Sequence, residues 1–402
     1  MKYVVILGDG MADFPIKSLG DKTPLEVADK KAIDELAKYS EMGLCKTIPL
    51  GMKPGSDVAN LSVLGYDVKA FYTGRSPLEA ASIGISLSDT DVTARANLVT
   101  LSDEENYADK TMIDYSAGEI STEEARELIG YLASKLNDDE RKLYAGISYR
   151  HCLVTDKGSL AGDLTPPHDI TGKPIKDYLP SSEVGKKYLE LMIKSSKLLK
   201  DHPVNKARIE KGKKPATSLW FWGEGTKPMI QNFSERYNLK GGMISAVDLL
   251  KGIGILSGMR VIEVEGATGN YDTNFSGKAQ SAIDGLKDGL DFIYIHMEAP
   301  DECGHHGDLD NKIFSIEQIS QKVVKPIYEY LQSTNEEFRI LICPDHPTPI
   351  AIKTHCSDPV PFMIFRSDKK AIGYDSYTEK NANKSGIVVE SGVELMQKFL
   401  NK

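Results

Sequence analysis

Residues 292–308 read FIYIHMEAPDECGHHGD, and this stretch decides the fold. It begins with a short, mostly apolar run, Phe292–His296, in which hydrophobic residues follow one another instead of alternating with polar ones. Such a run predicts a strand that is buried on both faces, as in a parallel sheet covered by helices. The polar residues after it then lie at the carboxyl end of the strand, where open α/β sheets bind their ligands.

Other runs of the same kind lie towards the two ends of the chain: Tyr3–Leu7, Val261–Val264, Arg339–Cys343 and Phe362–Phe365. Segments with helical periodicity lie between them, among them Ala32–Tyr39, Thr122–Lys135, Asn274–Leu286 and Ile313–Leu331. This alternation predicts an α/β domain in which helices sandwich a mostly parallel sheet.

The middle of the chain has a different pattern. It is more polar, with strand-like pieces at Ala94–Leu101 and Tyr149–Thr155 and a lysine-rich passage from Lys194 to Lys214. We interpret residues 90–215 as a smaller α+β domain inserted into a core domain of residues 1–89 and 216–402. A chain of 402 residues is long enough for two domains.

Composition excludes several classes of protein. Hydrophobic residues make up 41% and charged residues 27%, which is typical of a globular protein. The net charge of −9 argues against nucleic acid or an acidic membrane as a partner, so a negatively charged substrate needs locally placed cations. Five cysteines without a CxxC pair, and no apolar stretch of membrane-spanning length, predict a cytoplasmic protein.

Three of the predicted strands run into a carboxylate, namely Asp9, Asp301 and Asp345. The carboxyl ends of neighbouring parallel strands meet at one edge of a sheet, so we expect these side chains to converge. Any one of them could be a helix cap. Convergence of the whole set instead favours a metal site.

Histidine usage strengthens the prediction. Five of the eight histidines fall within one short stretch, at His296, His305, His306, His346 and His355. Asp301 and His305 are four residues apart, which places both on one side of a helix. His346 follows Asp345 directly at a strand end. Carboxylates combined with imidazoles suit Zn²⁺ or Mn²⁺, whereas an all-oxygen set would suit Mg²⁺ or Ca²⁺.

Ser56 is the candidate nucleophile. The sequence PGSD at 54–57 precedes an apolar helical run, Val58–Leu64, so the hydroxyl is expected at a helix N-terminus, where an anion is favoured. A serine hydroxyl is a weak nucleophile until a metal stabilises its alkoxide. The alternative is that Ser56 only caps the helix. A dinucleotide fingerprint and a GxxxxGK[ST] loop are both absent from the sequence, which weighs against an ordinary kinase.

The motifs GDGMAD, PGSDVANLSVLGYD, YTGRSPLEAASIGI, SYRH, EVEGATGNYDTN, APDECGHHGD and PDHPTP, in this order, resemble the archaeal-type cofactor-independent phosphoglycerate mutases of the alkaline phosphatase superfamily. The resemblance runs nearly end to end. It implies an alkaline-phosphatase-like α/β fold with an inserted lid domain. It also implies a glycolytic isomerase that interconverts 3-phosphoglycerate and 2-phosphoglycerate through a phosphoserine at Ser56, without 2,3-bisphosphoglycerate.

Two divalent metal ions are implied by the same resemblance. One site would be formed by Asp301, His305 and His355, and the other by Asp9, Ser56, Asp345 and His346. Mn²⁺ is the favoured ion, with Zn²⁺, Co²⁺ and Mg²⁺ as alternatives. The expected partner is a small phosphorylated substrate, with no nucleic acid and no membrane.

Most residues that resemble the substrate-binding elements of the family lie in the predicted insert. They are Arg150 and His151 in SYRH, and His168 and Asp169 in PPHDI, with Asn205 and Arg208 in HPVNKAR as further candidates and Lys251 in the core domain as a phosphate-neutralising one. An arginine fork suits a carboxylate. The alternative for each residue is an ordinary surface charge or a local hydrogen bond.

One position departs from the family pattern. Asn60 stands where these mutases tend to carry a histidine, and the passage NLSVLGYD is closer to a bacterial subgroup proposed to act as homoserine kinases. One alternative is therefore a transferase that passes phosphate from a donor to homoserine. Another is a metal-dependent phosphatase, in which water reaches phosphorylated Ser56.

Overall fold

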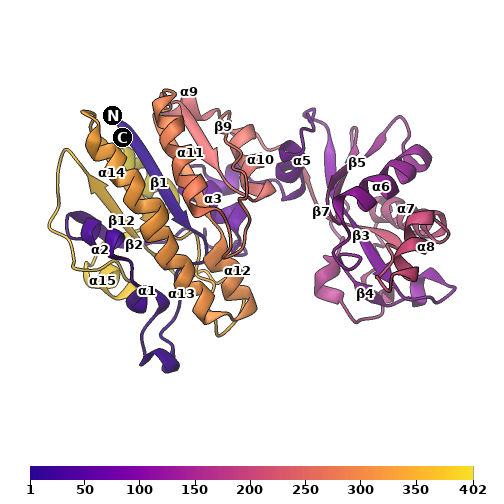
Figure 1. The fold of residues 1–402 in the computed structure, drawn as a ribbon. Coiled ribbons are helices and arrows are strands. Elements are labelled where there is room, and N and C mark those ends of the chain that lie inside the picture. The colour runs from indigo at the N-terminus through magenta and orange to yellow at the C-terminus, as the bar shows by residue number, and fades with distance from the viewer. Residues whose placement is uncertain (402) are drawn as a thin grey trace. The chain divides into compact units, whose positions relative to one another are not determined.

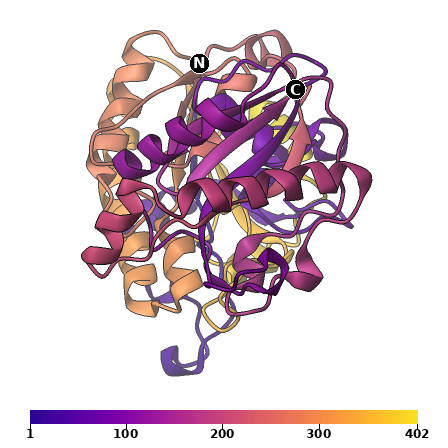
Figure 2. The same cartoon turned by 90° about the vertical axis from the view of Figure 1, so that its right-hand side faces the viewer.

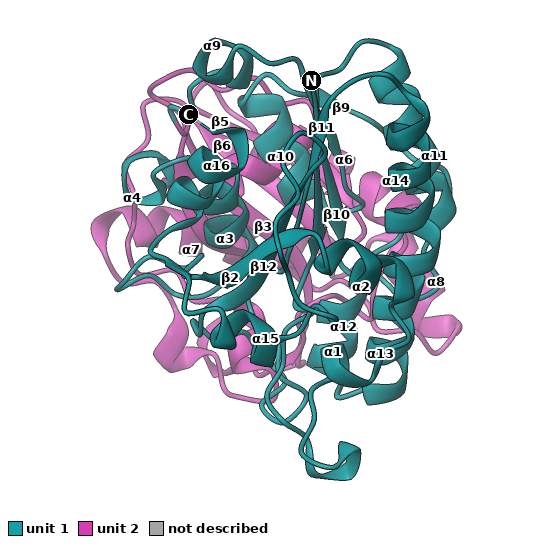
Figure 3. Cartoon of the chain, turned by 90° about the vertical axis from the view of Figure 1, so that its left-hand side faces the viewer, with its two compact units in different colours: residues 1–72, 229–402 teal, residues 73–228 magenta. Residues whose placement is uncertain are grey.

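The computed structural model describes residues 1–401 and divides into two compact units (Figure 1). Unit 1 consists of residues 1–72 and 229–402, and unit 2 consists of residues 73–228 (Figure 3). Unit 2 extends beyond the expected insert of residues 90–215 at both ends. Within the described residues, no helix has both the length and the apolar character that crossing a membrane requires.

The described part of unit 1 contains an eight-stranded sheet in the order β13-β2-β12-β11-β1-β10-β8-β9. Its strands span Val388–Val389, Ser40–Cys45, Val360–Arg366, Phe338–Cys343, Lys2–Gly8, Phe292–Met297, Gly241–Ile244 and Arg260–Val261, in that spatial order. The prediction of a mostly parallel sheet is confirmed. However, β12 runs antiparallel to both of its neighbours, and the strand expected at Val261–Val264 is confined to β9.

Helices cover both faces of this sheet (Figure 3). The longer ones are α2 (Lys31–Ala37), α3 (Ser56–Val63), α10 (Asp248–Leu256), α11 (Phe275–Lys287), α12 (Ala299–His306), α13 (Leu309–Gln318), α14 (Lys325–Ser333) and α16 (Gly392–Leu400). Shorter ones are α1 (Pro24–Val27), α4 (Val68–Phe71), α9 (Phe233–Tyr237) and α15 (Glu379–Lys384), with a single 3₁₀ turn at Lys17–Leu19. Helices α2, α11 and α14 lie on one side of the strands, and α3, α10 and α16 lie on the other.

Successive residues of β10 are therefore buried in different layers. Ile293 and Ile295 belong to the core beneath α11 and α14. The side chains of Tyr294 and His296 project to the opposite face, because side chains alternate along a strand. This opposite layer contains α3 and the candidate nucleophile, so β10 can present polar groups there.

The long helix expected at Ile313–Leu331 is interrupted. Helices α13 and α14 are joined by a π-helical turn at Ile319–Val324. Pro326 follows this turn in the first turn of α14. A proline inside a helix lacks an N–H and its ring crowds the carbonyl four residues earlier, and the wider π-helical turn accommodates both effects.

Unit 2 is built on a five-stranded antiparallel sheet within its described residues. Its strands are β3 (Val92–Leu101), β4 (Met112–Asp114), β5 (Arg141–Ile147), β6 (Arg150–Thr155) and β7 (Ser218–Thr226). Its helices are α5 (Ser76–Ser82), α6 (Thr122–Leu136), α7 (Glu183–Leu199) and α8 (Pro203–Glu210), with 3₁₀ turns at Tyr107–Asp109, Pro167–Ile170 and Lys176–Tyr178. Figure 2 looks onto α6 and α7, which cover one face of the sheet, while α5 packs on the other.

These elements explain why the expected domain boundaries were too narrow. Strand β7 pairs along nearly the whole length of β3, and α5 packs against β3 and β7, so both belong to unit 2. The segments through which the chain enters and leaves this unit lie side by side. The hydroxyl of Thr73 donates to the carbonyl of Thr226, and a Cβ added to Gly74 would lie 2.4 Å from the carbonyl oxygen of Glu224.

Candidate metal centre and active site

The first group of site residues forms around helix α12. This helix begins directly after β10, so Asp301 and His305 lie on one side of it at the carboxyl edge of the sheet. The Nε2 atom of His305 lies 3.2 Å from Asp301 Oδ2 and 2.9 Å from Nε2 of His355. Burial alone would raise the pKa of Asp301, but its hydrogen bonds from both histidines hold the pKa well below the usual value.

The second group forms where β1 and β11 end. Asp9 follows β1, Asp345 and His346 follow β11, and all three side chains are buried. Their ligand atoms lie within 4.8 Å of one another. Burial raises the pKa of Asp9 well above its usual value, and the negative charges of Asp345 and Asp301 raise it further.

Both groups fit divalent cations. Asp9 Oδ1 is buried and has no hydrogen-bond partner among the described residues, which is costly unless a cation contacts it. Burial lowers the pKa of His346, so its ring is neutral and can donate a lone pair. His346 also lies within ligand distance of Asp301 and His355, so the two groups adjoin. The mixture of carboxylate and imidazole donors suits Mn²⁺ or Zn²⁺.

Ser56 is brought into the second group. It is the first residue of α3, and Gly55 before it is the N-cap residue. The Ser56 hydroxyl donates to Asp9 Oδ2 at 3.4 Å and lies 3.2 Å from His346 Nε2. Within residues 1–401 it makes no capping bond, so the structure does not support the capping alternative. The side chain remains partly exposed.

Each of the three carboxylates also accepts a hydrogen bond from a residue outside the predicted ligand sets. His296 Nε2 contacts Asp9 Oδ2 at 2.9 Å, and Asn60 Nδ2 donates to Asp345 Oδ2 at 2.9 Å. The hydroxyl of Thr348 donates to Asp301. Metal centres characteristically have such supporting partners, because they fix the orientation of the ligands.

Of these supporting residues, His296 carried a sequence signal. It is a polar residue in an otherwise apolar strand, and the Ser245 hydroxyl contacts its other ring nitrogen at 3.2 Å. Thr348 had no such signal, because a threonine in a loop is common.

Comparison with known proteins shows which family this chain is similar to. The family model described as 2,3-bisphosphoglycerate-independent phosphoglycerate mutase matches residues 37–205. The enzyme of that name from Methanosarcina barkeri is 50% identical over 398 residues, which are 98% of each chain. The chain belongs to this family. A probable 2,3-bisphosphoglycerate-independent phosphoglycerate mutase from Geobacter sulfurreducens is 47% identical over the full length of both chains.

Two solved structures share the fold of this chain. A protein from Pyrococcus horikoshii matches with a TM-score of 0.83 and 30% identity, over 100% of this chain and 97% of the other. The cofactor-independent phosphoglycerate mutase from Thermoplasma acidophilum has the same fold at 24% identity, with a TM-score of 0.64 over 100% and 99% of the two chains. The expected α/β fold and the expected family of isomerases are therefore confirmed.

Arg150 and His151, two of the candidate substrate residues of the mutase, lie at the start of β6. His151 Nδ1 accepts a hydrogen bond from the Gly146 amide, so Nε2 carries the proton. Both His151 Nε2 and Arg150 Nε are buried and have no hydrogen-bond partner in the described part of the chain. Burial and the adjacent Arg150 charge lower the pKa of His151 to about 3, which keeps the ring neutral.

His168 and Asp169 lie in the 3₁₀ turn Pro167–Ile170. The His168 ring lies edge-on to Trp222, with ring centroids 5.0 Å apart, and Asp169 lies 3.6 Å from its Nε2. Burial lowers the pKa of His168, so it is predominantly neutral at pH 7.

Sequence analysis missed two arginines that lie near Arg150. Glu79 accepts from Arg75 Nε at 3.0 Å and lies 2.8 Å from Arg95 Nε. Burial alone would raise the pKa of Glu79, but the charges of Arg95, Arg75 and Arg150 lower it. We call Arg75, Arg95, Arg150 and Glu79 the arginine cluster, which has an excess of positive charge. The only sequence signal was Arg95 itself, an arginine within the predicted strand Ala94–Leu101, and it did not show which other residues lie near it.

The structure does not bring Asn205 and Arg208 into this cluster. Asn205 bonds to the backbone of Leu199 and Ala216, and Arg208 bonds to Glu124 and two backbone carbonyls. Both are buried and support the packing of α8, and their contact with substrate remains a prediction. Lys251 forms an ion pair of 2.7 Å with Glu263, and its contact with phosphate remains a prediction.

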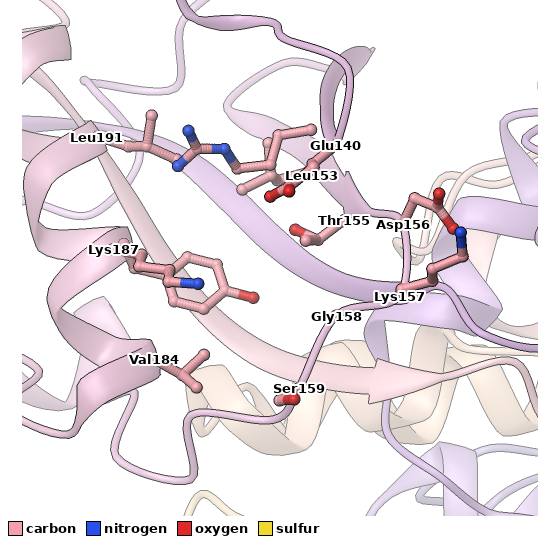
Figure 4. Close-up of a pocket in the computed structure, with 12 residues that line it drawn as sticks. Glu140, Leu153, Thr155, Asp156, Lys157, Gly158, Ser159, Val184, Lys187 and Leu191 are labelled. Atoms are coloured by element: carbon pink, nitrogen blue, oxygen red, sulfur yellow. The ribbon is translucent and has the colours of Figure 1, made fainter.

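Unit 2 also has a cavity of about 340 Å³ between β6 and α7 (Figure 4). Leu153, Thr155 and Tyr188 form part of its wall. Arg95 pairs with Cys152, so the arginine cluster and the residues that line the cavity lie on opposite faces of the sheet. None of the predicted substrate residues lines it.

Proposed function

We propose that the chain interconverts 3-phosphoglycerate and 2-phosphoglycerate through a phosphoserine at Ser56. The observation that carries this proposal is the position of the Ser56 hydroxyl, which contacts Asp9 and His346 while the residue stays partly exposed. A helix N-terminus at this point also favours a phosphate group. A relative named as a phosphoglycerate mutase, 50% identical over 98% of each chain, supports the choice of substrate.

Two divalent cations belong to this proposal, with Mn²⁺ favoured over Zn²⁺, Co²⁺ and Mg²⁺. We assign one to Asp301, His305 and His355, and the other to Asp9, Ser56, Asp345 and His346. When bound, the cations stabilise the serine alkoxide and the negative charge on the phosphoryl group that is transferred. The unpaired oxygen of Asp9 and the raised pKa of that carboxyl support this assignment, because a cation would offset both the burial of the carboxylate and its repulsion from Asp345 and Asp301.

The reaction then has two half-reactions at Ser56. In the first, Ser56 Oγ attacks phosphorus, its proton passes to Asp9 Oδ2, and the bond to the 3-oxygen of the glycerate breaks. The departing 3-oxygen takes up the proton that Asp9 Oδ2 received, so the carboxylate is regenerated. In the second, the 2-oxygen of the same glycerate gives its proton to Asp9 Oδ2 and attacks phosphorus, the bond between Ser56 Oγ and phosphorus breaks, and the proton on Asp9 returns to Ser56 Oγ. The phosphoryl group is conserved, so 2,3-bisphosphoglycerate is not required.

Unit 2 would bind the glycerate. The arginine cluster has more positive than negative charge, and a guanidinium fork is suited to a carboxylate. The buried N–H of His151 and the His168–Asp169 pair are candidates for the glycerate hydroxyls. A lid role of this unit, in which it keeps water from the phosphoserine, is part of the same proposal. A cytoplasmic location suits the five free thiols.

Phosphorus NMR of the Mn²⁺-reconstituted protein with 3-phosphoglycerate, and with no other phosphate donor, tests the proposal. Formation of 2-phosphoglycerate is expected in the wild type and is lost in Ser56→Ala. Ser62→Ala is the matched control, because that hydroxyl on the same helix accepts from the Gly392 amide instead. Inorganic phosphate alone would indicate a phosphatase. An unchanged spectrum from folded, metal-loaded protein would contradict the mutase and make homoserine phosphorylation the leading hypothesis.

A further inference from the structure

Asn60 lies one helical turn after Ser56 and makes three side-chain hydrogen bonds. Its Nδ2 donates to the carbonyl oxygen of Ser56 at 2.8 Å and to Asp345 Oδ2 at 2.9 Å. Its Oδ1 accepts from the hydroxyl of Tyr294 at 2.6 Å. Asn60 and Tyr294 are fully buried.

Only one orientation of the Asn60 amide satisfies these neighbours. The Ser56 carbonyl and the Asp345 carboxylate are acceptors, so both must face the NH₂ group. A flipped amide would place Oδ1 against two acceptor oxygens. The Tyr294 hydroxyl stabilises the observed orientation by donating to Oδ1. The assignment of oxygen and nitrogen therefore follows from the partners.

The three bonds link elements that are distant in the sequence. Asn60 belongs to α3, Tyr294 to β10, and Asp345 to the segment after β11. The Asn60 amide thus connects the backbone of the nucleophile directly to a carboxylate of the second metal group. Burying an amide and a phenol is costly unless both are hydrogen-bonded, and here their bonds point towards the site.

We propose that Asn60, held in place by Tyr294, is a positioning residue that keeps Ser56 and Asp345 at fixed positions relative to each other during phosphoryl transfer. This inference rests on the proposed function. The inference predicts an effect on only one of the two metal groups. Loss of the amide or of the phenol hydroxyl weakens metal binding by the group of Asp9, Asp345 and His346, and leaves the group around α12 unchanged.

Tyr294→Phe and Asn60→Ala test the inference, with Tyr66→Phe as a matched control. The Tyr66 hydroxyl is also buried and donates to the carbonyl of Gln231, but it contacts neither metal group. Mn²⁺ affinity is measured by a Mn²⁺ titration in which electron paramagnetic resonance detects the free ion. A His355→Ala background removes a proposed ligand of the other group, so that the second site is observed by itself.

We expect Tyr294→Phe and Asn60→Ala to weaken Mn²⁺ binding at the second site by about 10-fold to 100-fold. The turnover number falls by a similar factor and KM changes by less than about twofold, because substrate recognition is untouched. Intact mass after rapid quenching shows slower phosphorylation of Ser56. The double variant is no worse than Asn60→Ala, since both changes break one chain of bonds.

Additive effects in the double variant would overturn the inference, as would a Tyr294→Phe protein that matches Tyr66→Phe in metal affinity and turnover. A wild-type protein that binds no Mn²⁺ or forms no 2-phosphoglycerate would instead contradict the proposed function. The two failures are therefore distinguishable. Tyr294→Phe removes a single oxygen, so it keeps the comparison valid even where Asn60→Ala fails to fold.

Discussion

At the scale of single residues, replacing Asp9, which has an unpaired oxygen, is expected to change the unfolding free energy in opposite directions with and without metal. We expect Asp9→Asn to leave the unfolding free energy of metal-free protein unchanged or higher, because burial and the repulsion from Asp345 and Asp301, which raise the pKa of Asp9, no longer act against a charged group. With Mn²⁺ present, the variant should be less stable than the wild type. At a metal concentration of 100 times the dissociation constant, binding contributes about 2.7 kcal/mol, and a 100-fold weaker site contributes about 0.4 kcal/mol.

Urea unfolding in EDTA and in Mn²⁺ measures this reversal. Asp29→Asn is a suitable control, since that carboxylate is largely exposed on the surface. Equal stabilisation of the wild type and Asp9→Asn by Mn²⁺ would show that Asp9 is not a ligand.

Lys312 and Asp13 form a buried ion pair of 2.7 Å beside the site. The Lys312 ammonium also donates to the carbonyl of Thr348, so it ties the segment after β1 to the segment after β11. Lys312→Met leaves the Asp13 charge buried without its cation and is expected to cost about 3–5 kcal/mol of unfolding free energy. The exposed pair of Lys31 and Asp29 provides the control, because Lys31→Met should cost less than about 1 kcal/mol. Similar costs for the two variants in urea unfolding would refute this prediction.

How far the site could be predicted depended on the kind of signal each residue carried. Asp9, Asp301 and Asp345 were predictable because each follows a strongly apolar strand, and the structure places all three at one edge. Asn205 and Arg208 were further candidates because of the resemblance to the family, and such a resemblance does not specify which partners a buried side chain bonds to. The arginine cluster needed tertiary structure, because Arg75 and Arg95 come from different elements.

At the scale of elements, helix α12 can lie close to the segment after β11 because Gly304 has no side chain. A Cβ added to Gly304 would lie 2.5 Å from the carbonyl oxygen of Thr348. Gly304→Ala should therefore displace α12, cost about 1–3 kcal/mol and weaken Mn²⁺ binding by Asp301 and His305. The measurement is a Mn²⁺ titration combined with urea unfolding.

Gly130→Ala is the matched control for this helix substitution. Gly130 lies in α6, and a Cβ there would meet no atom within 4 Å among the described residues. Alanine should stabilise α6 by up to about 1 kcal/mol through helix propensity. If Gly304→Ala also stabilised the protein and kept both metal affinities, the close approach of α12 would have no functional role.

Prediction of elements succeeded where burial produced long apolar runs. The strands β1, β10 and β11 are of this kind, and they carry the site. Strands β2 and β8 were missed, because SEMGLC and GGMI contain glycine and lack a β-branched run. The reversed direction of β12 was not predictable from Phe362–Phe365, since an apolar run predicts burial but not direction.

At the scale of the whole molecule, the two units have separate hydrophobic cores. The largest cluster of unit 1 and the clusters of unit 2 share no residue. We therefore expect scanning calorimetry to show two unfolding transitions. Mn²⁺ should raise only the transition of unit 1, because the candidate ligands all belong to that unit. A single transition that shifts as a whole with Mn²⁺ would contradict the expectation.

The existence of an insert was predictable from the change in polarity along the chain, but its boundaries were not. Residues 73–89 and 216–228 lack the polar character that suggested the insert, and the second segment contains the apolar run Leu219–Trp222. They belong to unit 2 because α5 and β7 pack on β3, which is a tertiary relation. Contacts of this kind become visible only when the fold is known.

The contact of Thr73 with Thr226 brings the two ends of unit 2 together. A domain whose two ends lie close together can be replaced by the corresponding domain of a relative. The backbone of unit 1 then keeps its course, because the two insertion points stay at the same distance from each other. A chimera that carries residues 73–228 of a relative is expected to keep the serine chemistry of the recipient and to acquire the substrate preference of the donor.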